Sequence, residues 1–418
     1  MQIKKIVAGE ILDSRSNPTV ECEITLADGS SYRASVPSGA SKGQNEAHEL
    51  RDNDSSRFMG KGVLAAVSAV NDIIAPALEG KSVTDNRLAD SIMIALDGCI
   101  KKSNLGANAI LSVSFAMARA AAGALGVPLY RYVGGAYACR MPVPMMNILN
   151  GGAHASNNVD IQEFMIVPIG ADSFREAVRM GSEIYHTLRG LLVKRGYTTG
   201  VGDEGGFAPM FTSDATALAL ICEAIEKAGY KPGHDVALAL DIAASEWYKD
   251  GMYYLPKRKV NMTRVELSEY IISLIDGYPI ISVEDVMGDE DLDGWRTFRE
   301  KLGNKKIILV GDDLFVTDAS RIENGAKEKI ANAVLIKPNQ IGTLSETNEA
   351  IKCAAGYGYK TVMSHRSGET EDDIISDLAV GFGTHFIKTG APARSERVSK
   401  YNRLMRIESE LFGAEYGF

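Results

Sequence analysis

Six short apolar segments in the second half of the chain constrain its fold most strongly, because each ends in a charged or polar residue. The residues at these ends are Asp241, Glu284, Asp312, Lys337, His365 and Lys388. They are 43, 28, 25, 28 and 23 positions apart, a spacing that fits repeated strand–helix units. An open doubly wound sheet also contains such units, but it usually gathers its ligand groups on only a few loops. So many strand ends favour a closed α/β barrel, which we expect over residues 136–418.

Residues 1–135 follow another pattern and predict a smaller α+β domain that precedes and caps the barrel. Apolar segments at 20–26 and 31–36 flank Asp28-Gly29, which is typical of a β-hairpin. Two helical patterns follow later in this part of the chain. Residues 37–43, after the hairpin, are small and flexible, and we expect a mobile loop there.

Charge and cysteine content exclude some classes of function. The chain has 45 Lys and Arg residues against 54 Asp and Glu, a formal net charge of −9. Overall charge therefore argues against a nucleic-acid or membrane partner. The apolar stretch at 103–118 contains serines and asparagines and predicts a buried helix, not a membrane span. Five cysteines without a Cys-x-x-Cys pair, and no apolar leader, predict reduced thiols in a cytoplasmic protein; an additional surface or secreted pool stays open.

Three acidic residues, Asp241, Glu284 and Asp312, end successive predicted strands, so a barrel brings their carboxylates together. Without a cation these charges repel one another. A hard divalent cation removes the conflict, and an oxygen-only ligand set without His or Cys favours Mg²⁺ over Zn²⁺. The alternative is that each acid caps the helix that follows it. Three acids in register make the metal site the better interpretation.

Two lysines, Lys337 and Lys388, end predicted strands, where lysine is an uncommon residue to bury. Beside a metal and a second cation, Lys337 is expected to have a lowered pKa and to act as a base. A salt bridge to one of the acids is the structural alternative for either lysine. Arg366 and Ser367, which follow His365, offer donors for a phosphate or a carboxylate.

Other polar groups have no clear role from the pattern alone. Glu204 lies within Gly-Asp-Glu-Gly-Gly, and His154 ends Asn-Gly-Gly-Ala-His. Each segment could be no more than a tight turn. Gln162 and Glu163 come directly before or at the start of a short apolar segment, where strand-end solvation is an equal interpretation. These four residues can be assigned a role only if other evidence places them in one site.

These residues and further motifs resemble the enolase family over nearly the whole chain. The matching segments are Leu12-Asp13-Ser14-Arg15, Asn17-Pro18-Thr19-Val20, 105–111, 158–165, 202–209, 311–314, 337–343, 364–369, Arg394-Ser395-Glu396-Arg397 and Lys400-Tyr401-Asn402. So many motifs in family order make the resemblance highly specific. It implies an eight-stranded, enolase-type barrel behind the smaller domain.

The resemblance also implies a role for each candidate residue. Two Mg²⁺ ions are implied, with Asp241, Glu284 and Asp312 matching the ligands of one and Ser41 a ligand of the other. Lys337 matches the base and Glu204 the acid. The matching substrate-binding and supporting residues are His154, Gln162, Glu163, Arg366, Ser367 and Lys388.

The implied activity is the reversible dehydration of 2-phosphoglycerate to phosphoenolpyruvate in glycolysis and gluconeogenesis, by a homodimer or an octamer. One alternative is a racemase or lactonising enzyme that acts on a carboxylate without phosphate. Another is an enolase-like scaffold or binding protein with altered or reduced activity. Departures from the family pattern motivate the second alternative, at Ser16, Lys42, 99–101, Met210, Asp318 and His385. None of them is a matched metal ligand or part of the acid–base pair.

Overall fold

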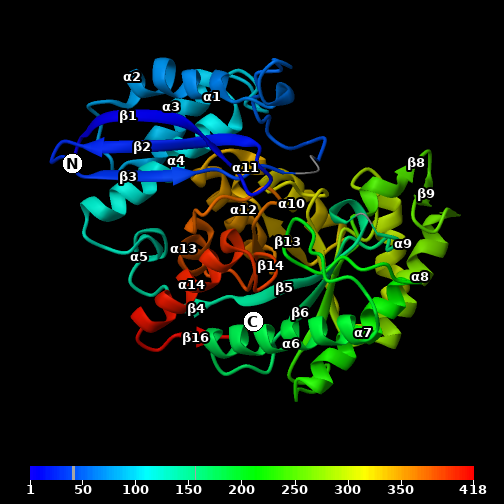
Figure 1. Ribbon diagram of the computed structural model, residues 1–418. Helices are drawn as coiled ribbons and strands as arrows, with labels where there is room; N and C mark the ends of the chain where they lie inside the picture. Colours follow the sequence, from blue (N-terminus) through cyan, green and yellow to red (C-terminus); the bar gives the residue numbers. More distant parts are fainter. Residues whose placement is uncertain (40–42, 156) are drawn as a thin grey trace.

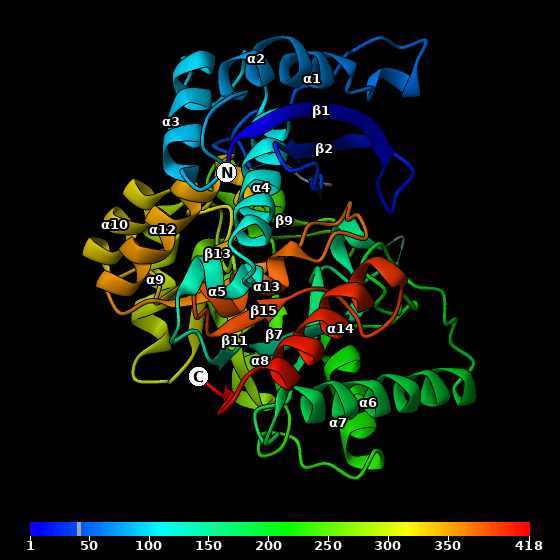
Figure 2. The ribbon, with the colours of Figure 1, turned by 90° about the vertical axis from the view of Figure 1, so that its left-hand side faces the viewer.

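The computed structural model describes residues 1–39, 43–155 and 157–418. It contains a smaller N-terminal α+β domain and a closed eight-stranded barrel, which confirms the expected fold (Figure 1). Ser41 and Lys42 of the predicted loop lie outside the described residues. Figure 2 shows the N-terminal domain, in blue and cyan, seated on one side of the barrel.

A three-stranded antiparallel sheet forms one layer of the N-terminal domain. Its strands are β1 (Ile3–Leu12), β2 (Pro18–Leu26) and β3 (Ser31–Ser35), in the order β1-β2-β3. β2 and β3 form the hairpin predicted around Asp28-Gly29. Gly29 has a φ of 90°, a conformation that glycine adopts without steric cost, so it suits this turn.

Helix α4 (Ala107–Ala124) packs against β2 and β3. Among the described helices it alone is long and apolar enough to cross a membrane by length and composition. In the structure most of its residues are buried inside the N-terminal domain, as expected for this apolar stretch. The other helices include α1 (Leu64–Ser68), the π-helical segment η2 (Ala69–Ile74), α2 (Ala75–Leu78), α3 (Asn86–Asp97) and α5 (Leu129–Gly134).

The barrel closes in the order β11-β12-β13-β14-β15-β5-β6-β7. Its strands are β5 (Val143–Asn150), β6 (Glu163–Val167), β7 (Ala237–Asp241), β11 (Ile280–Glu284), β12 (Ile308–Gly311), β13 (Ala333–Ile336), β14 (Lys360–Ser364) and β15 (Phe386–Lys388). The six segments predicted as strands are β7 and β11 to β15, and they pair in parallel. Their charged ends therefore lie at one end of the barrel, as expected.

Strand β6 departs from the parallel pattern, because it runs antiparallel to both β5 and β7. Its first residue, Glu163, pairs with Asp241, the last residue of β7. The start of β6 therefore lies where the parallel strands finish. This arrangement explains why Gln162 and Glu163 join the strand-end residues although they precede the apolar part of their own strand.

Helices cover the outside of the barrel, and its interior is packed. The helices are α6 (Phe174–Lys194), α7 (Asp214–Lys227), α8 (Arg264–Gly277), α9 (Leu292–Leu302), α10 (Ala319–Glu328), α11 (Pro338–Ile341), α12 (Leu344–Gly356), α13 (Ile374–Gly381) and α14 (Ser395–Glu410). Short strands β8 (Tyr248–Lys249), β9 (Met252–Leu255) and β10 (Val260–Met262) form a separate sheet, and β4 (Arg140–Met141) pairs with β16 (Glu415–Tyr416). Val310, Leu335 and Phe386 belong to the apolar cluster formed by the barrel strands. Because side chains fill the interior of the barrel, we expect reacting groups at the ends of its strands.

Backbone and side-chain contacts hold the N-terminal domain over these strand ends. Ser38 and Gly368 exchange two backbone hydrogen bonds of 2.8 and 2.9 Å. A Cβ at Gly368 would lie 2.5 Å from Asp13 Oδ2 and 2.7 Å from Ser38 Oγ, so this close approach requires glycine. On α12, Glu346 accepts a 2.8 Å hydrogen bond from the buried Lys102.

Candidate active site

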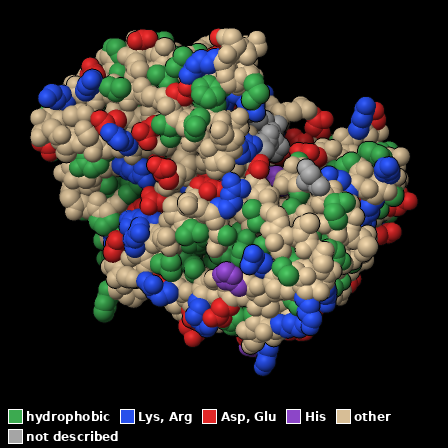
Figure 3. Space-filling model, viewed as in Figure 1, with side chains coloured by type: hydrophobic (Ala, Val, Ile, Leu, Met, Phe, Trp, Pro, Cys, Tyr) green, Lys and Arg blue, Asp and Glu red, His purple; other side chains and the backbone are tan. Residues whose placement is uncertain are grey.

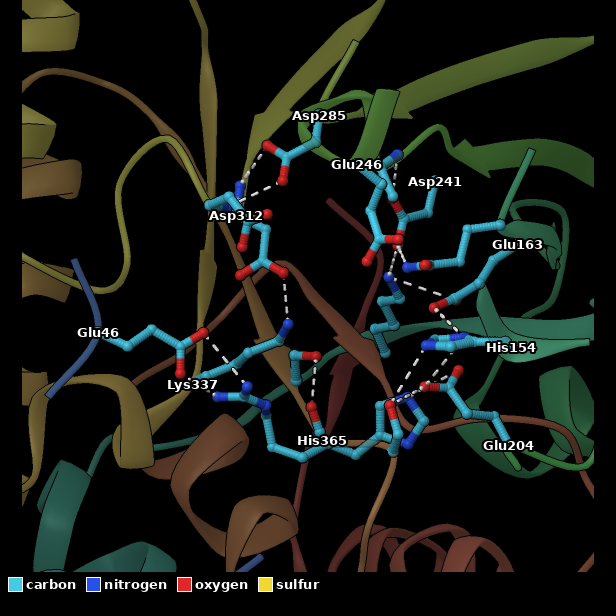
Figure 4. Close-up of a pocket in the computed structure, with 17 residues that line it drawn as sticks. Glu46, His154, Glu163, Glu204, Asp241, Glu246, Asp285, Asp312, Lys337 and His365 are labelled. Carbon is cyan, nitrogen blue, oxygen red and sulfur yellow. Dashed lines mark hydrogen bonds and ion pairs between the residues drawn. The ribbon is translucent and has the colours of Figure 1, made fainter. Parts of the chain in front are cut away.

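A cavity lies between the N-terminal domain and the carboxyl ends of the barrel strands, and the surface is hollowed between the two domains (Figure 3). Figure 4 shows the side chains that line it. They belong to Glu46, His154, Gln162, Glu163, Glu204, Asp241, Ala243, Glu246, Asp285, Asp312, Asp313, Lys337, Ser364, His365, Arg366, Ser367 and Lys388. Ten predicted site residues are among them. Of the remaining two, Glu284 contacts the cavity residue Lys388, and Ser41 lies outside the described residues.

One part of the cavity, which we call the carboxylate side, consists of Asp241, Glu284, Asp312, Lys337 and Lys388. Lys388 Nζ donates to Asp241 Oδ2 at 3.0 Å and to the two oxygens of Glu284 at 2.9 and 3.0 Å. Burial opposes its charge, but these carboxylates outweigh burial and hold the pKa of Lys388 well above its usual range. Lys388 therefore forms the salt bridge that was the structural alternative for this lysine. It is a buried cation that contacts two acids.

The second lysine of this side, Lys337, contacts Asp312 through its ammonium group. Burial would lower the pKa of Lys337, but the carboxylate of Asp312 outweighs burial, and this pKa lies above its ordinary value. Lys337 therefore has a salt-bridge partner here, and the lowered pKa expected for it beside a bound metal stays a prediction. Gln340 Nε2 also donates to Asp312 at 2.9 Å, and the backbone N–H of Asp312 donates to Asp285 at 2.9 Å.

The acidic residues near this side fit a metal ion by their chemistry. Burial and the charge of Asp241 raise the pKa of Glu284 well above its usual range, a conflict that a bound cation relieves. Asp285, Asp312 and Asp313 place ligand oxygens within 4.8 Å of one another. Burial and the charge of Asp312 raise the pKa of Asp313 to about 8. Because hard divalent cations prefer oxygen ligands, these acidic groups could hold one.

A neighbouring part of the cavity, which we call the histidine side, consists of His154, His365, Glu204 and Ser367. Figure 4 labels the first three of these residues. His154 Nδ1 lies 3.7 Å from Glu204 Oε1 and 3.6 Å from Glu163 Oε1. Ser367 Oγ lies 3.3 Å from His154 Nε2 and 3.5 Å from Glu204 Oε1. The loop after β14 and the segments that carry His154 and Glu204 thus meet around one carboxylate.

Two buried carboxyls here have opposite pKa shifts. Burial and the charge of Glu204 raise the pKa of Glu163 well above its usual range. Burial acts on Glu204 too, but His365 and His154 outweigh it and hold the pKa of Glu204 well below its usual range. Asn147 Nδ2 also donates to Glu204 at 2.9 Å. Neighbouring groups whose pKa values are pushed apart are typical of acid–base sites.

The buried Arg397 determines which nitrogen of His365 carries the hydrogen. Its Nη1 lies 2.6 Å from His365 Nδ1, and because arginine only donates, Nδ1 is the acceptor. The hydrogen of a neutral ring is then on Nε2, which lies 3.4 Å from Glu204. Burial lowers the pKa of His365 to about 3, so the ring is uncharged at neutral pH. Arg397 also donates to the carbonyl groups of Arg366 and Ser367 at 2.7 and 2.6 Å, which braces this loop.

The N-terminal domain contributes a carboxylate to the cavity. Arg366 donates to Glu46 Oε2 at 2.9 Å and to Asn339 Oδ1 at 3.2 Å. Burial opposes the charge of Arg366, but Glu46 outweighs it and raises the pKa of the guanidinium. The residue predicted to bind an anion is thus held by an acid from the other domain.

Sequence reasoning assigns no role to several residues that the structure places in or beside the cavity, among them Glu46, Asn147, His365 and Arg397. The position of His365 directly after an apolar segment indicates a site residue, because the other strand-end residues of the cavity have the same position. Asn147 lies in the middle of β5, where it is flanked by apolar residues and the next amide is Asn150 at the end of the strand. Nothing local distinguishes Glu46 or Arg397, because each reaches the cavity from a distant segment.

Comparison with known families gives two matches. The model described as the enolase C-terminal TIM barrel domain matches residues 138–417. The model described as the enolase N-terminal domain matches residues 3–133. Together they cover both domains of the structure, with the cavity at the junction. The chain therefore belongs to the enolase superfamily.

Proposed function

We propose that the protein is a Mg²⁺-dependent lyase that interconverts 2-phosphoglycerate and phosphoenolpyruvate with loss of water. The observation that carries the proposal is the convergence in one cavity of Lys337, Glu204 and acidic groups that could hold a cation. Enolase-superfamily sites in general combine a lysine or histidine base with one or two Mg²⁺ ions. The residues in this cavity suit that chemistry.

Asp241, Glu284 and Asp312 are the residues that would hold one Mg²⁺, and Ser41 is proposed to contribute to a second. When bound, Mg²⁺ stabilises the negative charge that develops on the substrate carboxylate. Lys337 loses its present salt bridge when Asp312 serves as a ligand. Its pKa then falls, which suits it to act as a base.

In the proposed mechanism, Lys337 takes the proton from the carbon beside the substrate carboxylate. A positioned base contributes about 10²–10⁴-fold to a rate. Glu204 then donates a proton to the neighbouring hydroxyl, which leaves as water. Because the pKa of Glu204 is low in the free protein, this carboxyl must take up a proton with the substrate. The negative charges of the substrate favour that uptake.

The remaining residues of the cavity position the substrate. Arg366 and Ser367 offer a charged and a neutral donor, which suit a phosphate group. A phosphate at Arg366 replaces Glu46 as its partner. Lys388 supplies a buried positive charge for the substrate carboxylate, and His154 and Gln162 complete the polar wall.

The family resemblance also supports a homodimer or an octamer in the cytoplasm. Size-exclusion chromatography with light scattering of the purified protein distinguishes these assemblies from a monomer.

The test is the rise in ultraviolet absorbance as phosphoenolpyruvate forms from 2-phosphoglycerate. We expect the rise with saturating Mg²⁺ and its loss with a chelator. No rise at saturating Mg²⁺ contradicts the proposal. Turnover of a phosphate-free carboxylate in its place supports the racemase or lactonising alternative, and Mg²⁺ binding without any turnover supports a binding protein.

A further inference from the structure

A second cavity lies at the opposite end of the barrel from the candidate active site. Its lining comes from the beginnings of neighbouring strands: Ile281 of β11, 303–308 before and in β12, Asn332 before β13 and Lys360 of β14. Arg299 on α9 and Phe418 complete it. Its volume of about 560 Å³ is within the range of about 300–1,000 Å³ typical of small-molecule sites.

The charge of this cavity contrasts with that of the whole chain. Four cationic side chains line it, from Arg299, Lys305, Lys306 and Lys360, whereas the described lining residues include no Asp or Glu side chain. The chain as a whole has a net charge of −9. The positive charge of this cavity therefore runs against the negative net charge of the chain. A cluster of positive side chains attracts anions.

Most of these cations have no acidic partner. Lys305 pairs with Asp276, but Arg299, Lys306 and Lys360 form no ion pair with any described residue. Burial and the charge of Arg140 lower the pKa of Lys360. An anion in the cavity supplies a counter-charge for Arg299, Lys306 and Lys360.

The cavity also has an apolar floor. Ile281 and Ile308 line it from the barrel strands. The ring of Phe418 lies 4.5 Å from that of Phe386, and Lys360 Nζ lies 4.9 Å from the centre of the Phe418 ring. A flat apolar group can pack here beside the cationic rim.

We infer that the base of the barrel binds an organic polyphosphate that carries a flat apolar group, the chemistry of a nucleoside triphosphate. Its phosphates contact Arg299, Lys360 and the two other lysines, and its ring packs against Ile281, Ile308 and Phe418. Several cations on one rim match a ligand with several negative charges. The site is separate from the candidate active site and does not depend on the proposed lyase activity.

Isothermal titration of the full chain without Mg²⁺ tests this inference, with three probes. ATP combines both features, tripolyphosphate carries the charge alone, and adenosine carries the ring alone. We expect ATP to bind at least 10-fold more tightly than either of the others. Equal affinity for ATP and tripolyphosphate, or no binding of ATP, overturns the inference.

Matched variants locate the binding. Arg299→Met and Lys360→Met should each weaken ATP binding at least 10-fold, because each removes one charge from the rim. Lys4→Met in the N-terminal domain removes the same charge far from the cavity and should leave the affinity unchanged. Because ATP could also occupy the candidate active site, Lys337→Ala serves as a second control. Binding that Lys337→Ala abolishes and Arg299→Met preserves contradicts the inference.

Discussion

On the carboxylate side of the candidate active site, Asp241 and Glu284 share the ammonium of Lys388, and Asp312 contacts Lys337. On the histidine side, Glu204 faces the rings of His154 and His365 and the amide of Asn147. One side pairs its carboxylates with lysine ammonium groups, and the other surrounds its carboxylate with two histidine rings and an amide donor.

This difference indicates two kinds of chemistry in one cavity. A group of carboxylates held by lysines can exchange those partners for a metal ion and for an anionic substrate. A carboxylate held by histidine rings and an amide can gain a proton when a negative substrate arrives nearby. We therefore propose that the carboxylate side stabilises charge and removes the proton, and that the histidine side delivers a proton.

The largest expected effect is at Lys337. Lys337→Ala removes the proposed base, so kcat should fall by at least 10²-fold and by up to about 10⁴-fold. Steady-state assays at saturating Mg²⁺ and 2-phosphoglycerate measure this loss. Lys360→Ala, at the other end of the barrel, should leave kcat within about 2-fold, because a lysine there takes no part in turnover. Equal losses in the two variants contradict the assignment.

The next effect concerns metal affinity. Glu284→Gln removes one charged oxygen ligand, and we expect Mg²⁺ to bind about 10–100-fold more weakly in a calorimetric titration. Glu204→Gln makes the same chemical change on the histidine side and should alter Mg²⁺ affinity by less than about 2-fold. If both variants lose Mg²⁺ affinity equally, the metal ligands are not confined to the carboxylate side, and the proposed division is wrong.

The sequence predicts the carboxylate side better than the histidine side, for a physical reason. Asp241, Glu284 and Lys388 each end a short apolar strand, so one local pattern predicts that a barrel gathers them. Glu163 escapes this rule because β6 runs antiparallel, and strand direction depends on pairing with distant segments. Arg397 is 31 residues from Arg366 and 194 from Asp203, yet it donates to the carbonyls of both. Such long-range bracing has no local signal.

A smaller effect is expected at Arg397. Arg397→Lys keeps the charge but loses the planar set of donors that contacts His365 and three backbone carbonyls. We expect kcat to fall about 10-fold, with a shift in the acidic limb of the pH–rate profile, because the hydrogen position on His365 changes. Mg²⁺ affinity should stay constant. A loss of kcat without any change in the pH profile indicates a purely structural role.

The smallest effect is the pH dependence of stability. The unfolded chain protonates His365 below about pH 6.5, whereas burial lowers its folded-state pKa to about 3. This histidine therefore lowers stability as pH falls from about 6.5 towards 3. His365→Asn removes that loss, so the drop in unfolding free energy between pH 7 and pH 6 should be smaller by about 0.7 kcal/mol. Urea denaturation at the two pH values measures it, and an unchanged drop means that His365 is already charged in the folded protein.

The division between the two sides is tested most directly by exchange of the carbon-bound hydrogen of 2-phosphoglycerate with deuterated solvent, followed by NMR. Glu204→Gln keeps the base but loses the acid, so it should exchange this hydrogen while forming little phosphoenolpyruvate. Lys337→Ala should do neither. Exchange by Lys337→Ala, or its absence in a folded, Mg²⁺-binding Glu204→Gln variant, contradicts the account.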